Sequence, residues 1–259
     1  MTGPTVAAAE SPTAGDPERL RRRALLREAG VYLATEESLS AGRRSEAIAE
    51  AALESGVRAI QVREKDGTAR RALEIAMALR RLTRRFDALL IVNDRIDIAL
   101  AAEADGVHLG QDDVPIADAR RLLGERALIG LSITDATQLT LPDAATADCL
   151  GVGAIFSTAS KSDATLTGLE LLKAARMAAD ARAALAPESS RAPIVAIGGI
   201  TAENAGRAVL AGADVVAVIS AITAAEDPGL AAATLLEAVR AVAAGAVRVA
   251  DAARLRTPR

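Results

Sequence analysis

The sequence predicts an α/β fold, a single-domain (β/α)8 TIM barrel. Eight short, apolar, β-branched runs follow one another from Val31 onward, and each is followed by a longer stretch of helix-favouring residues. The runs are continuously apolar rather than alternating, which is typical of parallel strands buried on both faces. The length of 259 residues also suits one such barrel without a second domain.

Strands that alternate with helices also allow an open doubly wound sheet. Eight repeats favour the closed barrel instead. The turn after the first predicted strand reads EESLSAG, which lacks the G-x-G-x-x-G pattern of a dinucleotide-binding fold. We therefore expect no nucleotide-binding crevice of the Rossmann type.

Two segments precede the first predicted strand. Residues 1–18 mix Pro, Gly, Ser, Thr and acids without periodicity or an apolar run behind a basic start, so we expect a disordered tail and no signal peptide. The following ERLRRRALLREAG predicts a short amphipathic helix whose arginines form a solvated charged face. Residues 19–245 are expected to form the barrel, and 246–259 a helical or frayed tail.

The predicted strands are five to seven residues long, and predicted helices fill the segments between them. The stretch 173–192 is long, rich in Ala and Arg, and ends in PESSRAP, which indicates an extended sixth helix with a surface loop. The strands are expected at 31–35, 58–63, 88–93, 105–109, 128–132, 149–155, 193–199 and 214–220.

The composition excludes several classes of protein. With 31 Lys+Arg against 34 Asp+Glu the net charge is −3, so no broad basic field is present for nucleic acid or an anionic membrane. The apolar residues, 51% of the chain, form no run long enough to span a bilayer. The single cysteine, Cys149, excludes an intrachain disulfide and fits a reducing compartment, so a cytoplasmic protein is expected.

Cations are expected at the mouth of the barrel, because barrel active sites are built from the loops that follow the strands. Arg63 and Lys65 follow the second predicted strand, and Lys161 follows the sixth. Three cations are more than an uncharged substrate needs, and they suit a highly charged anion such as a diphosphate.

A second anion site is expected after the seventh and eighth strands. Gly198 and Gly199 end the seventh, and Ser220 and Ala221 open the helix after the eighth, where many barrels bind phosphate with backbone N–H groups. A glycine pair at a tight turn also occurs for purely conformational reasons. Two anion sites imply two phosphorylated small-molecule substrates.

Two acids, Asp94 and Asp113, follow the third and fourth strands. Paired carboxylates beside a cationic phosphate pocket are what Mg²⁺ uses when it also binds phosphate oxygens. The alternative is that both acids pair with arginines or cap helices, and Asp112 is expected to be such a cap or a solvated neighbour. His108 lies within the fourth strand, where a structural hydrogen bond is at least as reasonable as catalysis. Ser132 has no evident activating base, so hydroxyls here are expected to bind anions.

Seven segments at predicted strand ends form one ordered set of motifs. They are QVREK at 61–65, NDR at 93–95, DGVHLGQDD at 105–113, IGLS at 129–132, GVGAIFSTASK at 151–161, AIGGI at 196–200 and AVISAI at 217–222. In sequence and order these segments resemble the thiamine-phosphate synthase family, and the resemblance extends from Val31 to Ile222.

This resemblance implies condensation of 4-amino-5-hydroxymethyl-2-methylpyrimidine diphosphate with a hydroxyethyl-thiazole phosphate, giving thiamine phosphate and diphosphate, with Mg²⁺ as the cofactor. The implied catalytic residues are Arg63, Lys65, Ser132 and Lys161. The implied ligands are Gln61, Arg63, Lys65, Asn93, Ser132 and Lys161 for the pyrimidine diphosphate; Thr158, Ser160, Gly199, Ile219 and Ser220 for the thiazole phosphate; and Asp94 and Asp113 for the metal.

The chain departs from the family pattern at three places. Gly153-Ala154 stands where Gly-Pro is frequent, Ser160 stands where a second Thr is usual, and Ile133-Thr134 follow Ser132 in place of a small residue and His. Ser160 keeps the hydroxyl that Thr would offer, so ligation is still expected.

Two other functions stay open as alternatives: a thiazole tautomerase, and a non-catalytic phosphate-binding barrel. A tautomerase needs a positioned base, and the presence of both acids and all three cations favours the synthase. A homo-oligomer is also left open.

Overall fold

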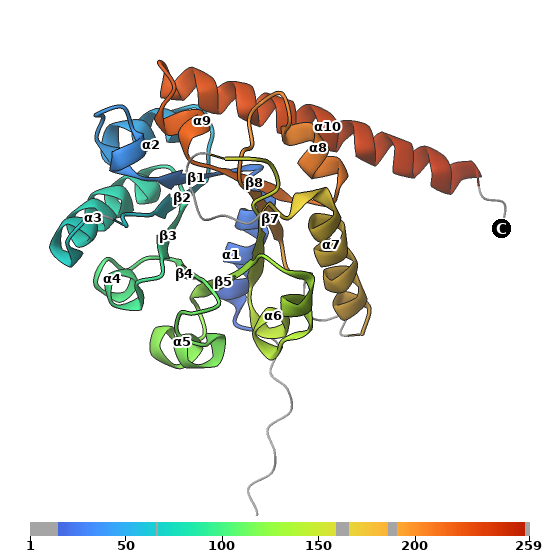
Figure 1. Ribbon diagram of the computed structural model, residues 1–259, viewed down its shortest axis with the longest axis horizontal. Coiled ribbons are helices and arrows are strands. Elements are labelled where there is room, and N and C mark those ends of the chain that lie inside the picture. Colours follow the sequence, from blue (N-terminus) through green and yellow to red (C-terminus); the bar gives the residue numbers. More distant parts are fainter. Residues whose placement is uncertain (1–14, 66, 159–165, 186–190, 257–259) are drawn as a thin grey trace, which may run out of the picture.

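The eight strands close into a parallel barrel in sequence order, with β8 hydrogen-bonded to β1 (Figure 1). The computed structural model describes residues 15–65, 67–158, 166–185 and 191–256. This architecture confirms the predicted (β/α)8 barrel. The strands are β1 Val31–Thr35, β2 Ala59–Val62, β3 Leu89–Asn93, β4 Gly106–Leu109, β5 Leu128–Ile133, β6 Cys149–Val152, β7 Ile194–Ile197 and β8 Val215–Val218.

Most strands are shorter than the apolar runs that predicted them. The run predicted as a strand over 193–199 ends at Ile197, because Gly198 and Gly199 adopt left-handed φ angles of 100° and 63° and leave the ladder. The run over 149–155 ends at Val152 for a related reason: Ile155 and Phe156 donate to Ile197 and Gly198 outside the strand. Apolar residues thus continue into the loops that border the cavity.

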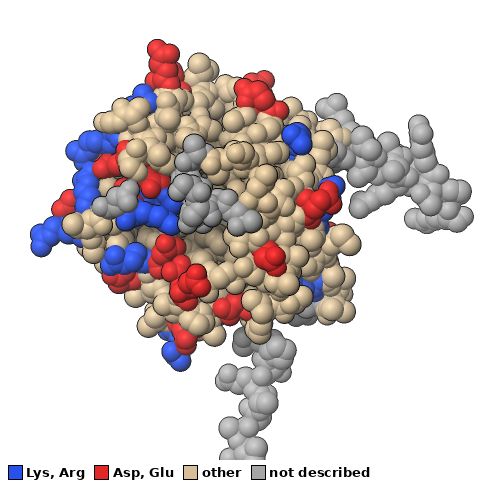
Figure 2. All heavy atoms as spheres, viewed as in Figure 1, with Lys and Arg blue, Asp and Glu red and all other residues tan. Residues whose placement is uncertain are grey.

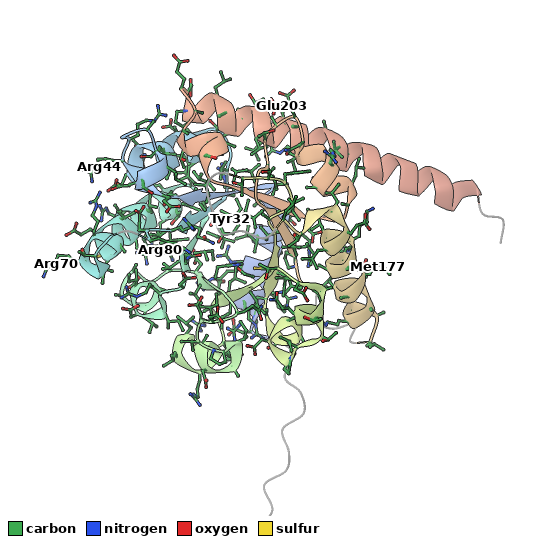
Figure 3. The ribbon with its side chains drawn as sticks, in the orientation of Figure 1. Tyr32, Arg44, Arg70, Arg80, Met177 and Glu203 are labelled. Carbon is green, nitrogen blue, oxygen red and sulfur yellow. The ribbon has the colours of Figure 1, made fainter. Side chains whose placement is uncertain are left out.

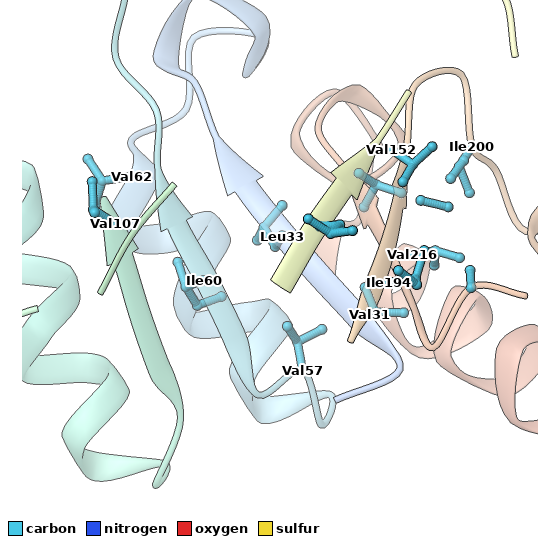
Figure 4. Close-up of a cluster of buried hydrophobic side chains, with 14 of the residues drawn as sticks. Val31, Leu33, Val57, Ile60, Val62, Val107, Val152, Ile194, Ile200 and Val216 are labelled. Atoms are coloured by element: carbon cyan, nitrogen blue, oxygen red, sulfur yellow. The ribbon is translucent and has the colours of Figure 1, made fainter. Parts of the chain in front are cut away.

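Successive strand residues point to opposite sides of the barrel wall, which creates two cores. Val31 and Leu33 face outward with Ile60, Val62 and Val216 and pack beneath the helices (Figure 4). The inward cluster includes Leu89, Ile91, Leu128, Cys149 and Val195 and fills the lower part of the barrel. Along β3 the inward positions become polar toward the C-terminal end, in the series Leu89, Ile91, Asn93.

The helices surround the barrel (Figure 1). In α3 the buried Ala72, Ile75 and Leu79 recur at helical spacing, and the hydroxyl of Thr68 caps the helix by accepting from the Arg71 N–H at 3.2 Å. The helices are α1 Pro17–Glu28, η1 Glu37–Leu39, α2 Ser45–Glu54, α3 Ala69–Arg85, α4 Ile96–Ala101, α5 Ile116–Leu123, η2 Ala136–Thr140, α6 Pro142–Thr146, α7 Gly168–Leu185, α8 Ala205–Leu210, α9 Ser220–Thr223 and α10 Pro228–Arg256.

Helix α1 closes the end of the barrel opposite the cavity, and its arginines do not form the solvated face that was expected. Leu26 joins the inward core. The side chains of Arg22 and Arg23 are only 16% and 12% exposed and lie within ion-pair distance of Asp105 and Asp148, which precede β4 and β6. The prediction was wrong because sequence spacing does not reveal that carboxylates from distant loops converge under this helix.

The long helix predicted over 173–192 begins earlier, at Gly168, and ends at Leu185. Of the tail predicted over residues 1–18, residues 1–14 lie outside the described residues, and α1 begins at Pro17. The division of the chain at 18 and 245 stays a prediction. No helix among the described residues combines the length and the apolar character needed to cross a membrane.

Candidate active site

A cavity of about 930 Å³ opens where the strands end, on the side of the barrel opposite α1. Most of the side chains predicted for the site line it, from seven different strand ends. These are Gln61, Arg63, Lys65, Asn93, Asp94, Asp113, Ser132, Thr158, Gly199, Ile219 and Ser220. Two other predicted site residues, Ser160 and Lys161, lie outside the described residues.

Charges of both signs border this end of the barrel. On the face seen in Figure 2, Lys and Arg side chains gather on the side of α2 and α3, and Asp and Glu side chains adjoin them. Within the cavity wall, Arg63 and Lys65 supply the cations, and Asp94 and Asp113 the carboxylates. The opposite wall, at Gly198, Gly199 and Ala221, presents backbone rather than charge.

The floor of the cavity is a layer of polar side chains that point into the barrel. The Gln61 Nε2 donates to the Tyr32 hydroxyl at 2.8 Å, and Tyr32 lies near the barrel centre (Figure 3). Complete burial raises the pKa of Tyr32 well above its ordinary value, so the phenol stays protonated. Gln61 is therefore held in one orientation at the floor.

His108 belongs to the same layer, with its Nε2 3.0 Å from the Ser132 Oγ. Burial lowers the pKa of His108 to about 4, so the ring is neutral at neutral pH. The imidazole ring fits only because two neighbouring residues are glycines. A Cβ at Gly130 or Gly151 would lie 2.4 Å or 2.7 Å from the nearest ring atom. The geometry gives His108 a hydrogen bond that orients the Ser132 hydroxyl.

Asp94 and Asp113 lie against each other in the cavity wall. The pKa of Asp94 is raised to about 6, first by burial and then by the charge of Asp113 and a hydrogen bond with it, whereas Lys65 and Arg63 act in the opposite direction. Asp113 is fixed by the Gly110 N–H, which donates to its Oδ2 at 2.6 Å. Arg95, which could have neutralised Asp94, pairs with Asp97 at 2.5 Å instead.

The chemistry of this pair fits Mg²⁺. No group of three or more potential metal-ligating His, Cys, Asp or Glu side chains occurs in the part of the chain that the structure describes. Mg²⁺ commonly needs only one or two carboxylates, because waters and substrate phosphate oxygens complete its octahedron. A divalent cation would also offset both causes of the raised pKa of Asp94, the burial of its charge and the repulsion from Asp113.

Gly199 brings together the loops after β6 and β7. Its φ is +63°, and a Cβ there would lie 2.3 Å from the Ser157 carbonyl oxygen. The Asn204 Nδ2 donates to the Gly199 carbonyl at 2.8 Å, which fixes the turn. Position 199 therefore requires glycine, because of its backbone conformation and because a Cβ has no room there. The same geometry leaves the backbone open to the cavity.

Sequence reasoning missed Tyr32, Glu36 and Gln138. Tyr32 and Gln138 line the cavity, and Glu36 forms an ion pair with Arg63. Tyr32 could have been found, because it occupies one of the alternate positions of β1 that point into the barrel. Glu36 could have been found because it is the first residue after that strand. Gln138 belongs to η2, for which no sequence signal was noted.

Comparison with known proteins identifies the family. The sequence model of the family described as "Thiamine monophosphate synthase" matches residues 31–222. The chain belongs to this family. It is 50% identical over 209 residues to the thiamine-phosphate synthase of Haloarcula marismortui, covering 81% of this chain and 96% of that protein. It is 46% identical over 217 residues to that of Natronomonas pharaonis, covering 83% and 96%.

A solved structure of the thiamine monophosphate synthase family agrees with the architecture described above. The thiamine phosphate pyrophosphorylase from Pyrococcus furiosus superposes with a TM-score of 0.72 at 38% identity, covering 84% of this chain and 98% of that one. The family match ends at residue 222, so α10 lies beyond it.

Proposed function

We propose that this chain is a thiamine-phosphate synthase. It condenses 4-amino-5-hydroxymethyl-2-methylpyrimidine diphosphate with a hydroxyethyl-thiazole phosphate and releases diphosphate. The observation that supports this best is the division of one cavity into a charged wall, with Arg63, Lys65 and the paired Asp94 and Asp113, and a wall of open backbone at Gly199. One wall suits a diphosphate with its metal, and the other suits a phosphate monoester.

On the charged wall, we assign Arg63 and Lys65 to the diphosphate, and Gln61, Asn93 and Ser132 to the pyrimidine. Lys161, which lies outside the described residues, is assigned to the diphosphate from the family pattern alone. Gln61 and Ser132 are oriented by Tyr32 and His108, so their polar groups are already directed when the substrate arrives. Asp94 and Asp113 would hold Mg²⁺, which supplies positive charge to the diphosphate oxygens when bound.

On the opposite wall, we assign the thiazole phosphate to Thr158, Gly199, Ile219 and Ser220. Ser160, which lies outside the described residues, is assigned to the same phosphate from the family pattern alone. The backbone at Gly199 is open for the reason given above, and Ser220 begins α9 at the end of β8. Hydroxyls and backbone N–H groups can bind a phosphate monoester without a counter-ion of their own.

The reaction needs charge stabilisation rather than proton transfer. The bond between the pyrimidine methylene carbon and the leaving oxygen breaks, and its electron pair leaves with diphosphate. The lone pair of the thiazole nitrogen then forms the new C–N bond. Arg63 and Lys65 stabilise the negative charge that develops on the leaving oxygens. The aliphatic Val195, Ile197 and Ile200 line the cavity and limit the access of water to the carbocation.

The experiment is a test of coupled product formation. The purified protein is incubated with Mg²⁺ and both substrates, and then with each substrate alone, while thiamine phosphate and diphosphate are quantified. A synthase forms both products in equal amounts and only when both substrates are present. Conversion of the thiazole phosphate alone would indicate a tautomerase, and binding without turnover would indicate a phosphate-binding barrel.

A further inference from the structure

Glu36 follows β1 and forms a buried ion pair with the Arg63 guanidinium. We propose that Glu36 is a positioning residue: it holds Arg63 so that the remaining guanidinium donors face the cavity and the diphosphate. This inference rests on the proposed function, because it assigns Glu36 a role through the cation that binds the leaving group.

The register of the barrel places the two residues side by side. β1 and β2 are parallel neighbours, and Thr35 lies opposite Val62. The residues that come next along the chain, Glu36 and Arg63, therefore also lie beside each other. The backbone N–H of Arg63 donates to the Thr35 carbonyl at 3.2 Å, so the hydrogen bonding between the two strands continues one residue beyond β2. The ion pair is therefore set by the sheet itself rather than by a separate loop.

Burial makes the pairing strong. Glu36 is 6% exposed and Arg63 is 8% exposed. A buried charge is stabilised where partners offset its desolvation, and the Glu36 carboxylate is one such partner of Arg63. Without Glu36, the guanidinium loses the contact that fixes its direction relative to the cavity.

Only Arg63 of this pair reaches the cavity. Arg63 lines the cavity, whereas Glu36 is not among the described residues that do so. A guanidinium carries five N–H donors in a rigid planar fork, so a carboxylate on one side fixes the direction of the others. Glu36 therefore acts on the substrate through Arg63 and not by contact.

The neighbouring Glu37 provides a matched control. It is also a glutamate in an ion pair with an arginine, with its Oε1 2.9 Å from the Arg71 Nη2. It also accepts from the Ser45 N–H at 3.3 Å. Arg71 belongs to α3 and is not among the described residues that line the cavity. Loss of the Glu37 charge should therefore leave substrate binding unchanged.

The test compares Glu36→Gln, Glu36→Asp and Glu37→Gln with the wild type. Measured quantities are kcat, KM for each substrate, the dissociation constant of inorganic diphosphate with Mg²⁺ by calorimetry, and the thermal midpoint. For Glu36→Gln we expect diphosphate to bind roughly 10-fold more weakly and kcat to fall roughly 10- to 100-fold, with KM for the thiazole phosphate unchanged. Glu36→Asp keeps the charge and should recover part of both losses, and Glu37→Gln should match the wild type.

A double-mutant cycle shows whether Glu36 acts through Arg63. In an Arg63→Lys background, Glu36→Gln should cause less than a 2-fold further change in diphosphate affinity or kcat, because the group that Glu36 orients is already gone. Full additivity of the two changes would overturn the proposal. So would a Glu36→Gln variant that loses thermal stability but binds diphosphate and turns over as the wild type does.

Different results would contradict the proposed function and the role of Glu36. A wild type that binds diphosphate but makes no thiamine phosphate contradicts the proposed function, while the diphosphate affinities still decide the role of Glu36. Tighter diphosphate binding in Glu36→Gln would mean that Glu36 competes with the substrate for Arg63, and it would overturn the positioning role. If Glu36→Gln does not fold, Glu36→Asp carries the same comparison.

Discussion

Asp94 is held under two unfavourable conditions at the end of β3. Its φ of +59° is in the left-handed region, which few residues other than glycine, Asn and Asp adopt. Its pKa of about 6 reflects a buried charge beside a second carboxylate. A residue under local strain inside a cavity points to a functional constraint, and the proposed divalent cation would account for the electrostatic part of it.

The metal proposal predicts separate effects on stability and activity. Asp94→Asn keeps a side chain that tolerates the left-handed backbone and removes the repulsion with Asp113, so the free energy of unfolding at pH 8 should not fall. Both Asp94→Asn and Asp113→Asn should lower thiamine phosphate formation by about 100-fold or more, because the departing diphosphate loses its main charge partner.

Chelation with EDTA should reproduce this loss in the wild type, and added Mg²⁺ should reverse it. The unfolding measurement is the control for correct folding. Near-wild-type turnover of both variants at limiting Mg²⁺ would show that the acids only pair with neighbouring groups.

The lowered pKa of His108 predicts how the stability of the protein depends on pH. The pKa of His108 is about 4 in the folded protein, against an ordinary value of 6.5. Between pH 4 and pH 6.5 the imidazole is therefore protonated in the unfolded chain and neutral in the folded protein. Stability from this group is therefore complete above pH 6.5 and is lost as the pH falls toward 4, by about 2 kcal/mol at pH 5. Denaturant unfolding at pH 7.5 and 5 should show this loss in the wild type and not in His108→Gln. An identical loss in both proteins would contradict the buried neutral imidazole.

At the scale of elements, three aspartates repeat one arrangement at the closed end of the barrel. Asp105, Asp148 and Asp214 each precede an even-numbered strand, β4, β6 and β8. Each accepts a backbone N–H from the preceding odd-numbered strand, at 2.8–2.9 Å, and pairs with an arginine of α3, α5 or α7. The aspartates thereby tie a helix to two strands in alternate repeats, and α1 adds further arginines to two of them.

This arrangement predicts that the closed end contributes stability rather than activity. Asp105→Ala would remove the carboxylate that accepts from the Leu90 N–H and pairs with Arg80 and Arg22, at a cost of about 3 kcal/mol or more in the free energy of unfolding. Asp97→Ala removes an exposed aspartate paired with Arg95 and should cost less than about 1 kcal/mol. Denaturant titrations would measure both, and kcat of the folded Asp105→Ala protein should equal that of the wild type. A small cost for Asp105→Ala would contradict the structural role.

At the scale of the whole molecule, the barrel and the polar side chains that follow its strands could be predicted, because both depend on local patterns. Apolar runs mark the strands, and the two-residue period of a strand places Gln61 and Asn93 inside the barrel. The ion pair between Glu36 and Arg63, and the carboxylates that converge under α1, depend on the register of neighbouring strands and on a helix that crosses the barrel end. No spacing along the chain encodes those contacts, which is why the arginines of α1 were assigned to solvent.

The proposed function requires one cavity to bind diphosphate on its charged wall and a phosphate monoester on its backbone wall. A crystal structure of the protein with Mg²⁺, thiamine phosphate and diphosphate would show where each group binds. We expect diphosphate within hydrogen-bond distance of Arg63 and Lys65, Mg²⁺ between Asp94 and Asp113, and the monoester phosphate at Gly199 and Ser220. Diphosphate at Gly199 and the monoester at Arg63 would contradict it.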